Sequence, residues 1–120
     1  MIRGLLIALA FGMAMAPAHA QQVNSAPSGM VRVLNKTDGN LQDLEIVKGQ
    51  SVVAGRIKIT LQECRYPSGN PAGNAYAYLE IFDQGVETPA YSGWMIASVP
   101  ALNPLDHPRY DVWVLRCKTS

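Results

Sequence analysis

Apolar and polar residues alternate along much of the chain after residue 30, which is the pattern of half-buried β-strands. In the clearest case, Ile57, Ile59 and Leu61 alternate with charged and polar residues. Successive side chains of a strand point to opposite faces, so these three apolar residues share one face. The sequence therefore predicts a strand here, with that face in a hydrophobic core.

Similar short runs recur along the chain and are separated by clusters of Gly, Pro, Asn and Asp that are typical of turns. Strands are expected near residues 30–34, 43–47, 52–53, 57–64, 75–82, 91–99 and 110–117. No long stretch has helical periodicity, and one short helical turn is predicted at 101–103. About seven short strands predict an all-β domain, built as a small antiparallel β-sandwich or barrel.

Two strands carry further expectations. Cys64 has the opposite parity to Ile57, Ile59 and Leu61, so a regular strand would place it on the opposite face. Either a β-bulge lies between Leu61 and Cys64, which we favour, or the cysteine sits off the main core face. Residues 110–117 are apolar at both parities, which predicts a central strand of its sheet.

The first twenty residues have the features of a signal peptide. Arg3 precedes an apolar run over residues 4–16, and Ala18-His19-Ala20 fits a small-x-small cleavage site. The alternative is an uncleaved anchor, which the shortness of the run disfavours because a spanning helix needs about 20 apolar residues. We predict a signal peptide at 1–20, a disordered lead-in at 21–29 and a single β-domain at 30–118, with no transmembrane segment in the mature chain.

Charge and cysteine content narrow the classes of function. The chain has ten Lys and Arg against nine Asp and Glu, and loss of Arg3 makes the two counts equal. Basic residues are scattered singly, which disfavours binding to nucleic acid or to an anionic membrane surface. Cys64 and Cys117 form an even pair in an exported domain, so we predict a disulfide. Their spacing does not fit a redox CxxC motif.

Residues 92–117 (SGWMIASVPALNPLDHPRYDVWVLRC) concentrate the side chains that could carry chemistry. Residue 107 is the single histidine after the predicted cleavage site, which is too few for a typical zinc site, and no nucleophile motif surrounds Ser92 or Ser98. We predict no catalytic residues, no metal and no cofactor. Two interpretations stay open for this stretch: a structural corner, or a contact surface for a ligand or partner. The candidate residues are Trp94, His107, Tyr110, Asp111 and Trp113.

The same stretch resembles the C-terminal signature of an exported proteobacterial domain-of-unknown-function family, number 2155. The matching positions are Gly93, Trp94, Met95, Pro100, Leu102, His107, Pro108, Tyr110, Asp111, Trp113, Val114 and Cys117. Upstream, Cys64 and residues 79–81 are also similar, and the resemblance extends over 31–117. It implies a bacterial envelope protein, without an assigned activity to transfer. Members' genes often neighbour a gene for an accessory subunit of respiratory complex I, which is a hint about partners.

Three functions from different classes follow from these observations. The first is a soluble periplasmic β-domain that is not an enzyme and binds an envelope or inner-membrane protein, as an accessory or assembly factor of a complex such as respiratory complex I. The second is a small-ligand or envelope-polymer binder that uses Trp94, His107 and Tyr110. The third is an enzyme, which would need a serine within about 3 Å of His107.

Overall fold

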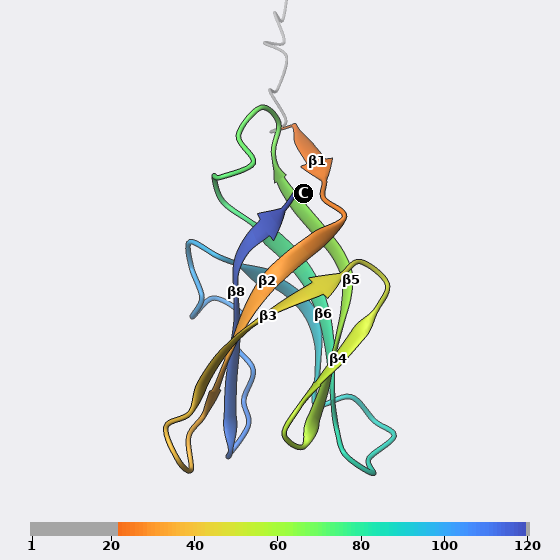
Figure 1. Cartoon of the computed structure of the whole chain (residues 1–120), viewed down its shortest axis with the longest axis vertical. Helices are drawn as coiled ribbons and strands as arrows, with labels where there is room; N and C mark the ends of the chain where they lie inside the picture. The colour runs from red at the N-terminus through yellow and green to blue at the C-terminus, as the bar shows by residue number, and fades with distance from the viewer. Residues whose placement is uncertain (1–21, 120) are drawn as a thin grey trace, which may run out of the picture.

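The chain folds into eight β-strands arranged in two sheets (Figure 1). This computed structural model describes residues 22–119, so the predicted signal peptide at 1–20 lies outside the described residues. The strands are β1 (Val23–Ser25), β2 (Ser28–Asn35), β3 (Leu41–Val47), β4 (Ser51–Ala54), β5 (Ile57–Pro67), β6 (Tyr76–Asp83), β7 (Tyr91–Ile96) and β8 (Tyr110–Lys118).

All strand pairs are antiparallel, and the chain passes repeatedly between the two sheets. The larger sheet has the order β1-β5-β6-β7, with β4 also paired to β5, and the smaller sheet has the order β3-β2-β8. The chain crosses between the sheets after β1, β3 and β7. The predicted all-β antiparallel sandwich is confirmed.

The inner faces of the two sheets form one hydrophobic core. Ile57, Ile59 and Leu61 are at most 1% exposed, so the face predicted from their alternation is the buried one. The other large side chains with almost no exposed surface are Val31, Ile46, Leu79, Ile81 and Val114. Burial of such a side chain stabilises a fold by about 1.5–3 kcal/mol, so this core is the main stabilising feature.

Two β-bulges turn both cysteines into the core. The register of β5 against β6 shifts between Leu61 and Glu63, and Cys64 lies on the inner face, fully buried. The predicted bulge is confirmed. The register of β8 against β2 also shifts, beside Met30, and this shift brings Cys117 onto the inner face. A bulge adds one residue to a strand, which changes the parity of every residue after it.

The segment predicted as a disordered lead-in belongs largely to the fold, which corrects that prediction. β1 pairs with β5, and the next residue, Ala26, is buried with its N–H donated to the Cys64 carbonyl at 2.7 Å. β2 begins at Ser28, two residues earlier than expected. Backbone hydrogen bonds hold β1 and require no apolar side chains, so the alternation pattern does not reveal it.

Two further expectations differ from the structure. Residues 101–103 are not helical: one hydrogen bond, from the Leu102 N–H to the Val99 carbonyl at 3.0 Å, closes an isolated turn over residues 99–102. β8 is an edge strand rather than a central one. Its apolar character on both faces arises because Trp113 and Leu115 are half-buried on the outer face of the small sheet, where Trp113 lies opposite Arg32.

The sandwich has two distinct ends. At one end, the disulfide end, Cys64 and Cys117 join the sheets; at the other, the hairpin end, lie the turns at 36–40, 55–56 and 84–90 and the start of β8 (Figure 1). Within residues 22–119, the structure has no helix with the length and apolar character needed to cross a membrane.

Candidate functional site

The five candidate residues of the 92–117 stretch lie in three separate places. Trp94 lies on the outer face of the large sheet and is 38% exposed, whereas Trp113 lies on the outer face of the small sheet. His107 and Tyr110 are buried at the hairpin end, and Asp111 is half-buried beside them. Trp94 pairs in register with Tyr78, five residues before the β6 end that contacts His107. The stretch therefore does not form one site.

His107 connects the 97–109 loop to the large sheet. Its Nε2 lies 2.6 Å from Oδ1 of Asp83, the last residue of β6. The N–H groups of Arg109 and Tyr110 donate to Nδ1 at 2.9 and 3.2 Å. Because Nδ1 accepts both of these bonds, the ring proton resides on Nε2 and donates to the carboxylate. The imidazole thus uses both nitrogens to hold the loop.

Tyr110 makes a second link between the sheets at the hairpin end. Its hydroxyl accepts a hydrogen bond of 3.0 Å from the N–H of Arg56, in the β4–β5 turn. Gly55 approaches this hydroxyl so closely that a Cβ at residue 55 would overlap it, and its φ of 60° is in the left-handed region. A side chain at residue 55 would therefore clash with the ring as well as strain the turn.

Lys36 ties the same loop to the small sheet. Its N–H donates to the Arg109 carbonyl at 2.8 Å, and its ammonium donates to the His107 carbonyl at 2.6 Å. The ammonium also lies 3.4 Å from Asp111 Oδ1, in an ion pair whose two side chains are both more than a third exposed. Asp111 is therefore a minor partner of this cluster.

A cavity opens beside this cluster, between the two sheets. Its volume is about 560 Å³, within the range of small-ligand pockets. The large sheet with its turns contributes four lining residues, and the other four come from the end of the 97–109 loop and the first residue of β8. The lining residues are Arg56, Asp83, Gln84, Val86, His107, Pro108, Arg109 and Tyr110.

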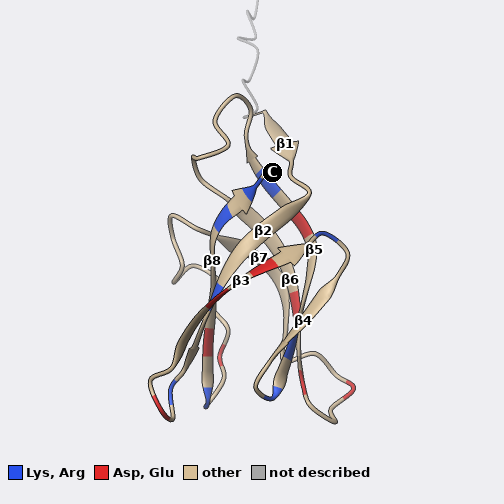
Figure 2. Ribbon diagram, viewed as in Figure 1, with Lys and Arg blue, Asp and Glu red and all other residues tan. Residues whose placement is uncertain are grey.

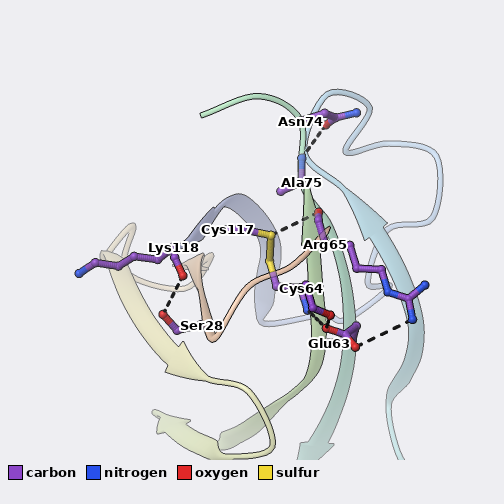
Figure 3. Close-up of a disulfide and its surroundings, with 9 residues drawn as sticks. Ser28, Glu63, Cys64, Arg65, Asn74, Ala75, Cys117 and Lys118 are labelled. Carbon is purple, nitrogen blue, oxygen red and sulfur yellow. Dashed lines mark hydrogen bonds and ion pairs between the residues drawn. A yellow bond between two sulfur atoms is a disulfide. The ribbon is translucent and has the colours of Figure 1, made fainter. Parts of the chain in front are cut away.

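At the opposite end of the molecule, the disulfide lies beside an ionic cluster (Figure 3). Glu63, the residue before Cys64, accepts hydrogen bonds from the Ser25 hydroxyl at 2.6 Å and from the Cys64 N–H at 3.1 Å. Lys48 forms an ion pair with it at 3.2 Å. Partial burial raises the pKa of Glu63, but these bonds outweigh burial and hold the pKa below its ordinary value.

The outer face of the large sheet carries an aromatic surface, which we define as Tyr76, Tyr78, Trp94, Ile96, Val23 and Arg65. The rings of Tyr78 and Trp94 meet edge to face, with 5.3 Å between centroids. The Arg65 guanidinium lies over the Trp94 ring at 5.2 Å. A shallow cavity of about 310 Å³ lies among Val23, Arg65, Tyr76, Trp94 and Ile96. This surface joins residues of four strands.

The small sheet carries two ion pairs between neighbouring strands, Arg32–Asp43 and Lys118–Glu45, and its charged residues are coloured along the ribbon in Figure 2. Arg32 donates two hydrogen bonds to Asp43, at 2.7 and 2.9 Å, and Lys118 donates to Glu45 at 2.8 Å. These hydrogen bonds hold the pKa of Asp43 and of Glu45 below their ordinary values. The two outer faces therefore differ: the small sheet carries these ion pairs beside Trp113, and the large sheet carries the Tyr78–Trp94 ring pair.

Side chains suited to metal or nucleophilic chemistry do not converge in the described part of the chain. Within residues 22–119, no three His, Cys, Asp or Glu side chains gather as a metal site would require. The ring of His107 contacts Asp83 and two backbone N–H groups, and no hydrogen bond joins it to a serine among these residues.

Several residues of these sites are absent from the sequence-based candidates. Asp83 is the last residue of β6 and begins a turn-rich stretch of sequence, where aspartate is common, and Arg56 is one of several scattered basic residues. Tyr78 and Arg65 join Trp94 only through the register of β5, β6 and β7. That register depends on the β5 bulge, so no local pattern in the sequence could have identified the aromatic surface.

Comparison with known proteins places the chain in a family. Residues 29–117 match a family of uncharacterised proteins conserved in bacteria, DUF2155. The chain belongs to this family. The DUF2155 match begins at Gly29 in β2 and ends at Cys117, so it spans both sheets, both cysteines and the hairpin-end cluster but not β1. The family resemblance drawn from the 92–117 stretch is confirmed.

One curated relative is the uncharacterised protein RP359 of Rickettsia prowazekii (strain Madrid E). It is 22% identical over 102 residues, which cover 82% of this chain and 66% of that protein. This DUF2155 chain therefore spans slightly less than two thirds of the relative it matches. No solved structure matches the chain.

Proposed function

We propose that this chain is an exported, non-catalytic interaction domain that binds a protein partner in the periplasm through its aromatic surface. The observation that carries the proposal is the Tyr78–Trp94 pair on the outer face of the large sheet. Trp and Tyr are enriched at the centres of protein interfaces, where they bury much apolar area with little loss of conformational entropy. Arg65, the third residue type enriched there, lies over the same indole.

Export is supported by two independent features. The Cys64–Cys117 disulfide fits an oxidising compartment, because cytosolic reductants keep most thiols reduced. The first twenty residues of the sequence have the basic start, apolar core and small-x-small site of a secretory signal. Together they favour the periplasm as the site of action.

The structural use of His107 supports a non-catalytic role. A general base needs a ring nitrogen free to take a proton from substrate. Nδ1 of His107 instead accepts two backbone N–H groups, and Nε2 contacts Asp83. Using the ring as a base would break bonds that hold the loop, so we assign His107 to the structural corner rather than to a reaction.

The partner is proposed to be an inner-membrane complex for which this domain is an accessory or assembly factor. Respiratory complex I is the first complex to test, because of the gene neighbourhood implied by the family resemblance. The aromatic surface is shallow and open on a sheet face, so it suits contact with another protein better than binding of a small molecule.

A second candidate function, binding of an envelope polymer, is favoured by one observation. The Tyr78 and Trp94 rings meet edge to face at an interplanar angle of 84°, the Tyr78 hydroxyl lies 3.2 Å from the Ser92 hydroxyl, and Glu63 is opposite Tyr78 in register. Exposed aromatic rings beside polar groups also suit a sugar chain. The predicted ligand set of Trp94, His107 and Tyr110 does not serve this function, since Trp94 lies far along the sheet from the other two.

A pull-down from detergent-solubilised envelopes tests these proposals. The tagged full-length chain should retain an inner-membrane complex, identified by mass spectrometry, and Trp94→Ala should lose it. Trp113→Ala, on the outer face of the other sheet, is the matched control and should keep it. Retention of the complex by Trp94→Ala, or its equal loss in both variants, would contradict the proposed surface. Cosedimentation with purified peptidoglycan, lost in Trp94→Ala, would support the second candidate instead.

A further inference from the structure

Three hydrogen-bond donors without acceptors line the cavity at the hairpin end. The guanidinium groups of Arg56 and Arg109 form no hydrogen bond or ion pair with any residue of 22–119, although the backbone groups of both residues are bonded. The hydroxyl of Tyr110 accepts the Arg56 N–H, but its own hydrogen has no acceptor in the described chain. Tyr110 is only 4% exposed, so most of this ring is already removed from water.

The cavity offers few acceptors to balance these donors. Of the eight lining residues, Asp83 alone carries a carboxylate, and its Oδ1 already accepts the Nε2–H of His107. Nδ1 of His107 already accepts two backbone N–H groups and Nε2 contacts Asp83, so the ring offers no free acceptor. The lining thus carries two guanidinium charges and one carboxylate.

We infer that this cavity binds a small molecule through an oxyanion, either a carboxylate or a phosphate, held between Arg56 and Arg109 with the Tyr110 hydroxyl as a third donor. Guanidinium groups match such oxyanions because each presents paired N–H donors in a plane. The volume of about 560 Å³ suits a small molecule rather than a single ion. The site is separate from the aromatic surface and goes beyond the proposed function.

The geometry of the hairpin end keeps this site open. Gly55 leaves room for the Tyr110 hydroxyl, and the Asp83–His107 bond holds the 84–90 loop against the start of β8. Asp83 and His107 are positioning residues here, because they fix the two walls from which Arg56 and Arg109 project. Arg56 and Arg109 are exposed and their side chains form no hydrogen bond or ion pair within residues 22–119, so we expect replacement of either to have little effect on folding.

A titration followed by two-dimensional NMR of the ¹⁵N-labelled chain, at constant ionic strength, tests the inference. Inorganic phosphate and succinate serve as probes for the two oxyanions, and sodium chloride replaces them in the reference series. We expect saturable shifts confined to the amides of Arg56, Gln84, His107, Arg109 and Tyr110 with at least one probe. The probe that saturates at the lower concentration identifies the preferred oxyanion.

Variants make the assignment specific. Arg56→Gln and Arg109→Gln should each weaken binding about tenfold, and the double variant should abolish it. Arg116→Gln is the matched control, an exposed arginine near the disulfide end of β8 that also lacks an ion pair in the described chain. Trp94→Ala should leave the titration unchanged, so failure of this site and failure of the proposed interaction surface are distinguishable.

Three outcomes would overturn the inference. The first is the absence of a saturable shift with both probes, and the second is an equal response to sodium chloride. The third is an equal loss of binding in Arg116→Gln, which would show a general effect of net charge. A melting curve and an amide spectrum of each variant confirm that its fold is intact.

Discussion

Both ring nitrogens of His107 form hydrogen bonds, and these bonds hold the start of β8 against the large sheet at the hairpin end. The Nε2–H donates to Asp83 of the large sheet, while Nδ1 receives two N–H groups at the start of β8. The side chain is 9% exposed, so water cannot readily replace these partners. Asp111, by contrast, is only half-buried, and within residues 22–119 its side chain forms one ion pair, with the Lys36 ammonium.

His107→Ala should therefore destabilise the fold clearly, and Asp111→Ala should not. Loss of a partner from buried hydrogen bonds costs about 1–3 kcal/mol, and about 1 kcal/mol lowers the melting temperature of a domain of this size by roughly 4–8 °C. An exposed ion pair contributes only about 0–1 kcal/mol. Thermal melts of both variants, beside Glu87→Gln as a surface control, measure the difference. Equal melting temperatures for His107→Ala and wild type would reject the structural role.

Among the elements, the 97–109 loop acts as a strap along the side of the sandwich between β7 and β8. The Tyr91 hydroxyl donates to the Asn103 carbonyl at 2.7 Å, and the Asn103 amide donates to the Trp94 carbonyl at 3.1 Å. Leu105 inserts its side chain into the core. The strap thereby occupies part of the free edge of β7, which would otherwise be open to pairing with another strand.

Tyr91→Phe should loosen this strap without unfolding the sandwich. The change removes the hydroxyl bond to Asn103 and leaves the ring in place, at a cost of about 1 kcal/mol. Limited proteolysis should then cut within residues 97–109 several times faster than in wild type. Tyr66→Phe is the matched control, because the Tyr66 hydroxyl forms no hydrogen bond in the described chain. Unchanged cleavage in Tyr91→Phe would show that the strap is held by its other contacts, those of Leu105, His107 and Lys36, rather than by the Tyr91 hydroxyl.

The whole molecule is closed differently at its two ends. At the hairpin end, polar contacts of His107 and Tyr110 join the sheets, whereas a covalent bond joins them at the disulfide end (Figure 3). The two cysteines are 53 residues apart in sequence, with Cα atoms 5.8 Å apart. A link over such a distance removes much of the freedom of the unfolded chain.

Reduction of the disulfide should lower the stability of the whole domain rather than of one end. The chain-entropy relation gives about 4 kcal/mol for a loop of this size, a large part of the 5–15 kcal/mol typical of a small domain. Urea unfolding of the Cys64→Ala/Cys117→Ala variant measures this loss. Labelling of unfolded, unreduced wild-type chain should find no free thiol, and two labelled thiols would contradict the bond.

Acid should also destabilise the molecule, through the carboxylates whose pKa values lie below normal. A group with a lowered folded-state pKa contributes stability above its unfolded pKa and loses it as pH falls through the folded value. For Glu63, whose ordinary pKa is 4.5, the loss therefore begins below about pH 4.5. In urea unfolding measured at several pH values, Glu63→Gln should reduce the loss of unfolding free energy at acid pH, while Glu87→Gln should not. If Glu63→Gln loses the same unfolding free energy at acid pH as wild type, the acid sensitivity arises from other groups.

The sequence by itself determined the local features of this protein. Alternation at Ile57, Ile59 and Leu61 predicted their buried face, and the parity of Cys64 predicted a bulge. Both predictions were possible because the direction of a side chain in a strand follows from its position relative to its neighbours in sequence. The even cysteine count predicted the disulfide, and the residues around His107 identified the family.

Only the tertiary structure decided which residues far apart in the chain meet. It separated Trp94 from His107, joined Trp94 to Tyr78 and Arg65, and brought Asp83 and Arg56 to the start of β8. It also placed β8 at a sheet edge and ordered β1, both against expectation. Register, strand order and backbone pairing depend on contacts across the whole fold, and alternation within one strand carries no information about its neighbours.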